Sequence, residues 1–181
     1  MVATSIGKHC MYARALGAKF RALPWAVRHV HADHEWRILI GRVTVRRGNS
    51  WWARLAARLY GFPPELREAP CRVEFTTTRA GEHWWRRFGG HPMSSVLSVE
   101  NGKLYETFGL LKVELICAKR GGTLVIASGP ARFCSIPMPR WLSPDVIASE
   151  KERDGAFLFR VSIRIPAFGL IAAYRGTLAT A

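Results

Sequence analysis

Strict alternation of apolar and polar side chains runs through most of the chain beyond residue 70, and it constrains the fold more than any other feature. The clearest case is residues 157–165, where every odd-numbered position is apolar and the even-numbered positions are largely polar. A β-strand points successive side chains to opposite faces, so this pattern predicts a strand with one buried and one largely solvated face. Similar segments recur around residues 73–77, 84–88, 93–99, 104–108, 111–117, 124–126 and 171–174.

Glycine-containing dipeptides separate these segments. Asn101-Gly102 and Asp154-Gly155 favour tight hairpins because both residues of each pair tolerate positive φ, and Gly89-Gly90 and Gly121-Gly122 mark two further turns. Short hairpins join antiparallel neighbours, and roughly nine or ten strands in one sheet must curl. We therefore expect a mainly β (α+β) fold: a single strongly curved antiparallel sheet or partly closed β-barrel with two short N-terminal helices.

Within the segment from Trp36 to Val45, the alternation of apolar and polar residues shifts by one position. Ile38 and Ile40 share a face with Trp36, whereas the apolar Val43 and Val45 have the opposite parity. We expect a β-bulge or a sharp bend at Gly41-Arg42, where the alternation slips.

Two short helices are predicted before and after that segment. The first lies within residues 11–31, with a break or a new start at Pro24, and carries apolar residues at three- and four-residue steps. The second runs from about Trp51 to Tyr60, with Ser50 or Asn49 as its N-cap. The apolar residues of the first are Tyr12, Leu16, Phe20, Leu23 and Val27, and one apolar face of the second holds Trp51, Trp52, Leu55, Ala56 and Leu59.

The chain is expected to form one domain over residues 11–181, with residues 1–10 frayed. The longest loop runs from Ile136 to Pro144, and its prolines make it the best candidate for a lid or rim. No apolar run reaches the roughly 18 residues of a membrane-spanning helix, and no secretory leader is recognised. The four cysteines, none in a C-x-x-C pair, are interpreted as reduced thiols in a cytoplasmic protein.

The charge balance is strongly basic, with 27 Lys and Arg against 13 Asp and Glu, a formal charge of +14. Such a field attracts polyanions, anionic lipid surfaces or acidic partners. An arginine-coated surface without a specific partner is the simpler interpretation. Nucleic-acid binding ranks last among the functions considered, because neither a helix-turn-helix nor an RNP signature is present.

Several segments resemble the bacterial Domain of Unknown Function 4166 family. They are residues 42–48, residues 84–90 with Trp84 and Phe88-Gly89-Gly90, Glu106 with Phe108-Gly109, and residues 157–165 followed by 174–176. The resemblance covers about Leu23 to Leu178, and it departs from the family pattern at Met93, where an aromatic is usual, and at Leu110, where proline is usual. It implies no established activity, but family members occur alone or fused behind dehydrogenase-like or reductase-like modules. No G-x-G-x-x-G follows a strand in this chain, so an oxidoreductase partner would be a separate chain.

Three groups of residues are weighed as sites. Trp84 and Arg86 on one strand face form either a stacking and cationic platform for a ligand or a cation–π pair in the core, and the core interpretation is favoured. Glu106, Glu114 and Glu150 lie in apolar strands, and we expect pairing with Arg86, Arg160 or Arg175 rather than a catalytic acid. His29, His31 and His34 are candidate metal ligands, but exposed, partly stacking histidines are preferred.

No catalytic motif is recognised, and no cofactor is expected. The favoured hypothesis is a non-enzymatic binding domain for a hydrophobic or amphipathic molecule, such as a lipid, with an anionic group as an option. The alternatives are an accessory domain that partners a dehydrogenase- or reductase-like protein, and binding of nucleic acid or an anionic surface through net charge. The candidate ligand contacts are Trp84, Arg86, Phe88, Glu106, Phe159, Tyr174 and Arg175.

Overall fold

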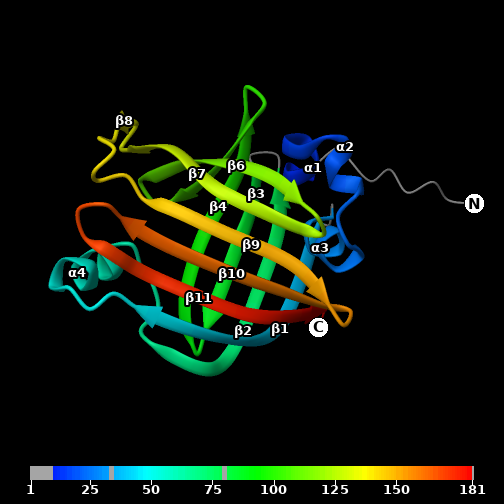
Figure 1. Cartoon of the computed structure of the whole chain (residues 1–181), viewed down its shortest axis with the longest axis horizontal. Coiled ribbons are helices and arrows are strands. Elements are labelled where there is room, and N and C mark those ends of the chain that lie inside the picture. The colour runs from blue at the N-terminus through cyan, green and yellow to red at the C-terminus, as the bar shows by residue number, and fades with distance from the viewer. Residues whose placement is uncertain (1–9, 33–34, 79–80, 181) are drawn as a thin grey trace, which may run out of the picture.

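The described chain is a closed antiparallel β-barrel with short helices at both ends (Figure 1). The structure is a computed structural model that describes residues 10–32, 35–78 and 81–180. The strands are β1 (Trp36–Arg47), β2 (Leu66–Thr78), β3 (Gly81–Phe88), β4 (His91–Glu100), β5 (Lys103–Phe108), β6 (Leu111–Arg120), β7 (Thr123–Phe133), β8 (Ile136–Pro137), β9 (Asp145–Arg153), β10 (Ala156–Ile165) and β11 (Gly169–Thr180).

The barrel closes because β6 pairs with β7 at the two ends of the strand order β6-β5-β4-β3-β2-β1-β11-β10-β9-β7. Every neighbouring pair is antiparallel, and β8 adds two residues beside the end of β7. The expected curved antiparallel sheet is therefore confirmed, in its closed form. Closure removes the long unpaired edges that an open sheet of this size would expose.

The predicted hairpins are present. Asn101 and Gly102 have φ values of 50° and 77°, and Asp154 and Gly155 have 54° and 75°, which is the left-handed conformation that a two-residue hairpin turn requires. These two turns lie at the same end of the barrel as the turn between β6 and β7, whereas the turns that follow β3, β5 and β10 lie at the opposite end.

Three helices, labelled α1 to α3 in Figure 1, cover the first of these ends. Pro24 directly precedes α3, as the sequence predicted for a new helix start. Cys10 is the N-cap of α1, and its thiol donates a hydrogen bond to the carbonyl oxygen of His31 at 2.7 Å. The five apolar residues predicted for this segment are all buried. The helices are α1 (Met11–Leu16), α2 (Ala18–Arg21) and α3 (Trp25–His31).

The other barrel end, called the α4 end below, carries α4 (Trp51–Leu59). Ser50 caps it, because its hydroxyl accepts a hydrogen bond from the Ala53 amide at 3.1 Å. Four short helices are thus present in the described residues where two were expected, since the first predicted helix is divided into three. No helix in the described part of the chain is long and apolar enough to cross a membrane. Of the predicted frayed residues 1–10, all but Cys10 lie outside the described residues, and Cys10 is buried.

The predicted phase slip in β1 is wrong. Odd-numbered residues face the interior along the whole strand, so Arg37 is 6% exposed whereas Trp36 is 62% exposed. Gly41 occupies an inward position where a Cβ would approach the carbonyl oxygen of Thr177 to 1.8 Å. The pairing with β2 and β11 sets the inward face of β1, and its pairing with β2 is irregular between Val43 and Val45.

Candidate functional site

A cavity of about 110 Å³ lies inside the barrel and is walled mainly by apolar side chains. Tyr12 and Val30 line it toward the helices α1 to α3, and Tyr60, Phe62 and Pro144 line it toward the α4 end. The inward faces of the strands supply its wall, because period-two alternation places their apolar residues on one side of the sheet. Against this apolar lining, a few polar groups dominate the chemistry of the interior.

The first polar group is a network on three adjacent strands, β3, β4 and β5. The Arg86 guanidinium donates to Ser95 Oγ at 2.7 Å and to Glu106 Oε1 at 2.9 Å, and the Ser95 hydroxyl donates to the same carboxylate oxygen at 2.6 Å. The Arg86 and Glu106 side chains are only 9% and 16% exposed. The guanidinium also lies 4.5 Å from the ring centroid of Trp84. The charge on Arg86 is therefore already compensated within the protein.

The second polar group joins a helix to the barrel wall. His31, at the end of α3, approaches Glu150 of β9 with Nε2 2.5 Å from Oε2, and both residues are buried. The Tyr12 ring centroid lies 4.1 Å from that of His31. Among the described residues, none provides a hydrogen-bond partner for His31 Nδ1. The two residues are 119 positions apart in sequence, so only the folded barrel creates the pair.

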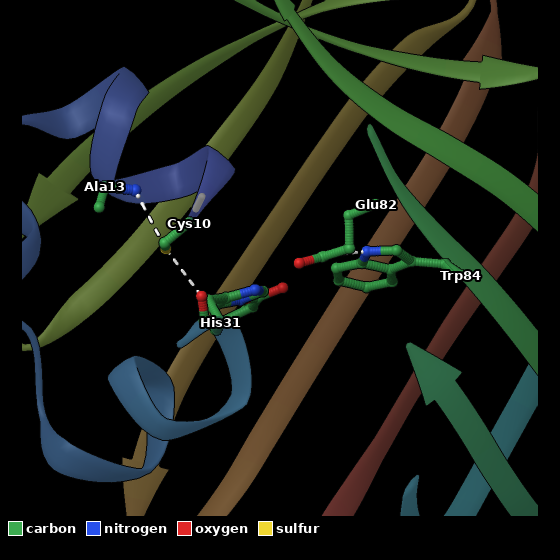
Figure 2. Close-up of polar contacts among 6 residues, drawn as sticks. Cys10, Ala13, His31, Glu82 and Trp84 are labelled. Carbon is green, nitrogen blue, oxygen red and sulfur yellow. Dashed lines mark hydrogen bonds and ion pairs between the residues drawn. The ribbon is translucent and has the colours of Figure 1, made fainter. Parts of the chain in front are cut away.

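Figure 2 shows the neighbourhood of His31. The thiol of Cys10 fixes the backbone of His31, and Trp84 reaches toward the same region from β3. The indole Nε1–H of Trp84 donates to Glu82, which is buried. Burial lowers the pKa of the nearby Arg37 to about 10, and the charge of Glu82 opposes that shift. The Arg37 guanidinium still remains charged at neutral pH.

Burial has the opposite effect on the interior thiols and phenols. Desolvation raises the pKa of Cys71 to about 12 and, with a further contribution from the charge of Glu150, that of Cys117 to about 12. It also raises the pKa of Tyr12 and Tyr174 above the ordinary phenol value, since the interior disfavours a new negative charge. These groups are therefore held neutral, and the buried thiols are poor nucleophiles.

Six of the seven predicted ligand contacts line this cavity, and the structure does not bring the seventh to them. Arg175 is exposed on the outer wall, in a basic hollow that also holds Arg42 and Arg160. The predicted pairing of Glu106 with Arg86 is present, whereas Glu114 pairs with Lys103 and Glu150 with His31. The six cavity residues are Trp84, Arg86, Phe88, Glu106, Phe159 and Tyr174.

The histidine cluster does not converge on one point in the described residues. His31 points into the barrel, the His29 ring stacks on Trp25 at 4.5 Å, and His34 lies outside the described residues. Within the described ranges, no three His, Cys, Asp or Glu side chains are grouped so that they could hold a metal ion.

A family model for a domain of unknown function, DUF4166, matches residues 23–178 of the chain. The chain belongs to the DUF4166 family. The match covers all of the barrel strands except the last residues of β11, together with the inward residues described above other than Tyr12. Neither the curated proteins nor the solved structures contain a match.

Sequence reasoning missed several polar residues of this DUF4166 barrel. Ser95 and Glu82 stand an even number of positions from the buried apolar residues of their strands. Period-two alternation could therefore have predicted that both side chains face the interior. Arg37 was missed because the apolar residues Trp36 and Ile40 were taken to mark the inward face of β1, whereas both are exposed. Tyr12 was recognised only as a core residue, since nothing local indicates that it contacts His31.

Proposed function

We propose that the barrel binds a small, uncharged and largely apolar molecule in its interior cavity. The observation that carries the proposal is an apolar cavity of about 110 Å³ whose lining includes Arg86 and Glu106 of the compact network that these two residues form with Ser95. Small-ligand sites are typically apolar pockets with a few placed polar groups, and they occur in the mouths of β-barrels. Engineered apolar cavities of about 150 Å³ take up a benzene-sized guest. By comparison, the part of a ligand that enters this cavity should be no larger than about that size.

The interior charge balance favours a neutral guest. Three buried or nearly buried carboxylates, Glu82, Glu106 and Glu150, face two guanidinium groups, Arg37 and Arg86. An anionic guest would have to compete with Glu106 for Arg86 in a region of low dielectric, where unpaired charge is costly. A hydroxyl or carbonyl can instead hydrogen-bond to the network without disturbing its charge.

A matched pair of probes tests the charge requirement. Octanol and octanoate have the same chain length but differ in charge, and we expect octanol to raise the melting temperature of the protein more than octanoate at equal concentration. Native mass spectrometry should show one bound molecule. Equal or stronger stabilisation by octanoate would contradict a neutral guest, and no shift with either probe would contradict the interior site.

Filling the cavity should weaken binding strongly without unfolding the protein. Ala148 lines the cavity, so Ala148→Leu places extra carbons in existing space and should change the free energy of unfolding by less than about 1 kcal/mol. The octanol affinity should fall about tenfold or more, as measured by isothermal titration calorimetry. Ile147 is the neighbouring residue on β9, is 63% exposed and faces outward, so Ile147→Ala is the matched control and should leave affinity unchanged. Full octanol affinity in Ala148→Leu would place the guest elsewhere.

A further inference from the structure

Helix α4 exposes its large apolar side chains. Its buried face consists of the small residues Ala53, Ala56 and Ala57, whereas Leu59 is 75% exposed and Trp51 is 61% exposed. This reverses the usual arrangement, in which the large apolar residues of a surface helix face the core. The predicted apolar face was correct in composition, but of its five members only Ala56 is buried.

The outward residues of α4 occupy one sector of the helix. Successive helical residues are rotated by about 100°, so Trp51, Trp52, Leu55 and Leu59 fall within a sector of about 100° opposite the alanines. Arg54 and Arg58 flank that sector on one side and are also exposed. A nine-residue helix with Trp and Leu on one side and flanking Arg has the side-chain distribution of an interfacial helix.

The same end of the barrel carries further exposed apolar residues. Eight of the fourteen exposed large apolar side chains in the described residues lie there. Two interactions link their segments: the Trp52 ring lies 5.8 Å from Phe168, and the Ala167 amide bonds to the Trp141 carbonyl at 3.0 Å. We call these eight the apolar rim: Trp51, Trp52, Leu55, Leu59, Leu110, Phe133, Ile136 and Trp141.

Exposed arginines outnumber exposed acids around the apolar rim. Within residues 46–68, 88–91, 107–112, 131–146 and 164–170, seven arginines are exposed against three acids, Glu65, Glu68 and Asp145. Figure 1 places α4, β8 and the β10–β11 turn together at this end. The segment from Ile136 to Pro144, predicted as a lid or rim, also lies here, and its last residue lines the cavity.

We propose that the α4 end docks on an anionic lipid bilayer through the apolar rim. Tryptophan is favoured at the membrane–water interface, and arginine is attracted to the negative surface of anionic lipids. A polyanion such as nucleic acid would account for the arginines but leaves the exposed leucine and tryptophan unexplained. An apolar protein surface would account for the rim but not for the excess of arginine. An anionic bilayer matches both features.

Vesicle flotation tests this proposal with the full-length protein. The protein should float with vesicles of phosphatidylcholine and phosphatidylglycerol, and only weakly with phosphatidylcholine alone. Trp51→Ser combined with Leu55→Ser should reduce binding about tenfold or more, because two side chains no longer insert. The matched control is Trp85→Ser with Ile147→Ser, which removes exposed residues from the barrel wall and should leave binding unchanged.

Both double variants change exposed side chains, and thermal unfolding should show that they fold as the parent protein does. Docking requires no guest in the cavity, so Ala148→Leu should float normally, and a failure of the ligand proposal would not affect this result. Absence of flotation with anionic vesicles overturns the proposal. So does vesicle binding that persists in the α4 double variant but is removed by salt, since that would indicate a general polyanion surface.

Discussion

Raising the pH from 9 to about 11 is expected to lower the free energy of unfolding by about 2 kcal/mol through Cys71 alone. Burial raises its pKa from 9.0 to about 12, so across this interval the unfolded chain releases the thiol proton and the native protein retains it. Well below pH 9 both states are protonated, and the thiol contributes no pH dependence. Its stabilising contribution is lost progressively as the pH rises from 9 toward 12.

The other buried acids act in the same direction. The pKa of Cys117 is raised to about 12, and those of Tyr12 and Tyr174 are raised above the ordinary phenol value. Their effects add to that of Cys71, so the free energy of unfolding, which is about 5–15 kcal/mol for a typical domain, should fall steadily between pH 9 and 11. Urea denaturation at several pH values, followed by circular dichroism with a reductant present, measures the slope.

Two variants separate this mechanism from general alkaline damage. In Cys71→Ala, the unfolding free energy should fall less steeply with pH. The slope should decrease by the contribution of one titrating group, roughly 1.4 kcal/mol per pH unit. Cys134 is exposed, so Cys134→Ser should leave the slope unchanged. A urea midpoint that stays constant between pH 9 and 11 would contradict the expected burial of these groups.

Removing Glu150 is expected to destabilise the protein by about 3 kcal/mol, because it leaves the buried His31 without its polar partner. Glu150→Leu tests this directly by urea denaturation at neutral pH. Glu150→Gln keeps an oxygen that accepts from the imidazole N–H and should cost much less.

A double-mutant cycle isolates the interaction. Combining His31→Phe with Glu150→Leu replaces the polar pair by apolar side chains of similar size, and should recover much of the lost stability. Helix α3 packs against β9 and β10 and thereby positions the histidine, so the single variants should also loosen the helices over the barrel end. Additive losses in the double variant would show that the two residues are energetically independent.

Local signals in the sequence correctly located much of the barrel. The hairpins at Asn101-Gly102 and Asp154-Gly155, the cap at Ser50 and the alternation over residues 157–165 depend on the conformational preferences of a few consecutive residues. Such preferences act before any tertiary contact forms. For the same reason, Trp84 and Arg86 could be placed on one face from their spacing alone.

The inward face of β1 could not be predicted in that way. Its exposed Trp36 and Ile40 mimic a buried face, whereas its buried face includes Arg37 and Gly41. Register with β2 and β11 decides which parity is inward, and that register involves residues far away in the sequence. The outward position of Arg175 follows from the same pairing, because Tyr174 on the adjacent position faces the cavity.

The sequence by itself determined that the chain alternates, turns and pairs as an antiparallel sheet, because those properties are encoded within short windows. Only the tertiary structure decided that β1 meets β11, that His31 reaches Glu150, and that the large side chains of α4 face outward. Each of these depends on how distant segments share limited interior space. A residue type and its neighbours cannot specify such contacts until the barrel has closed.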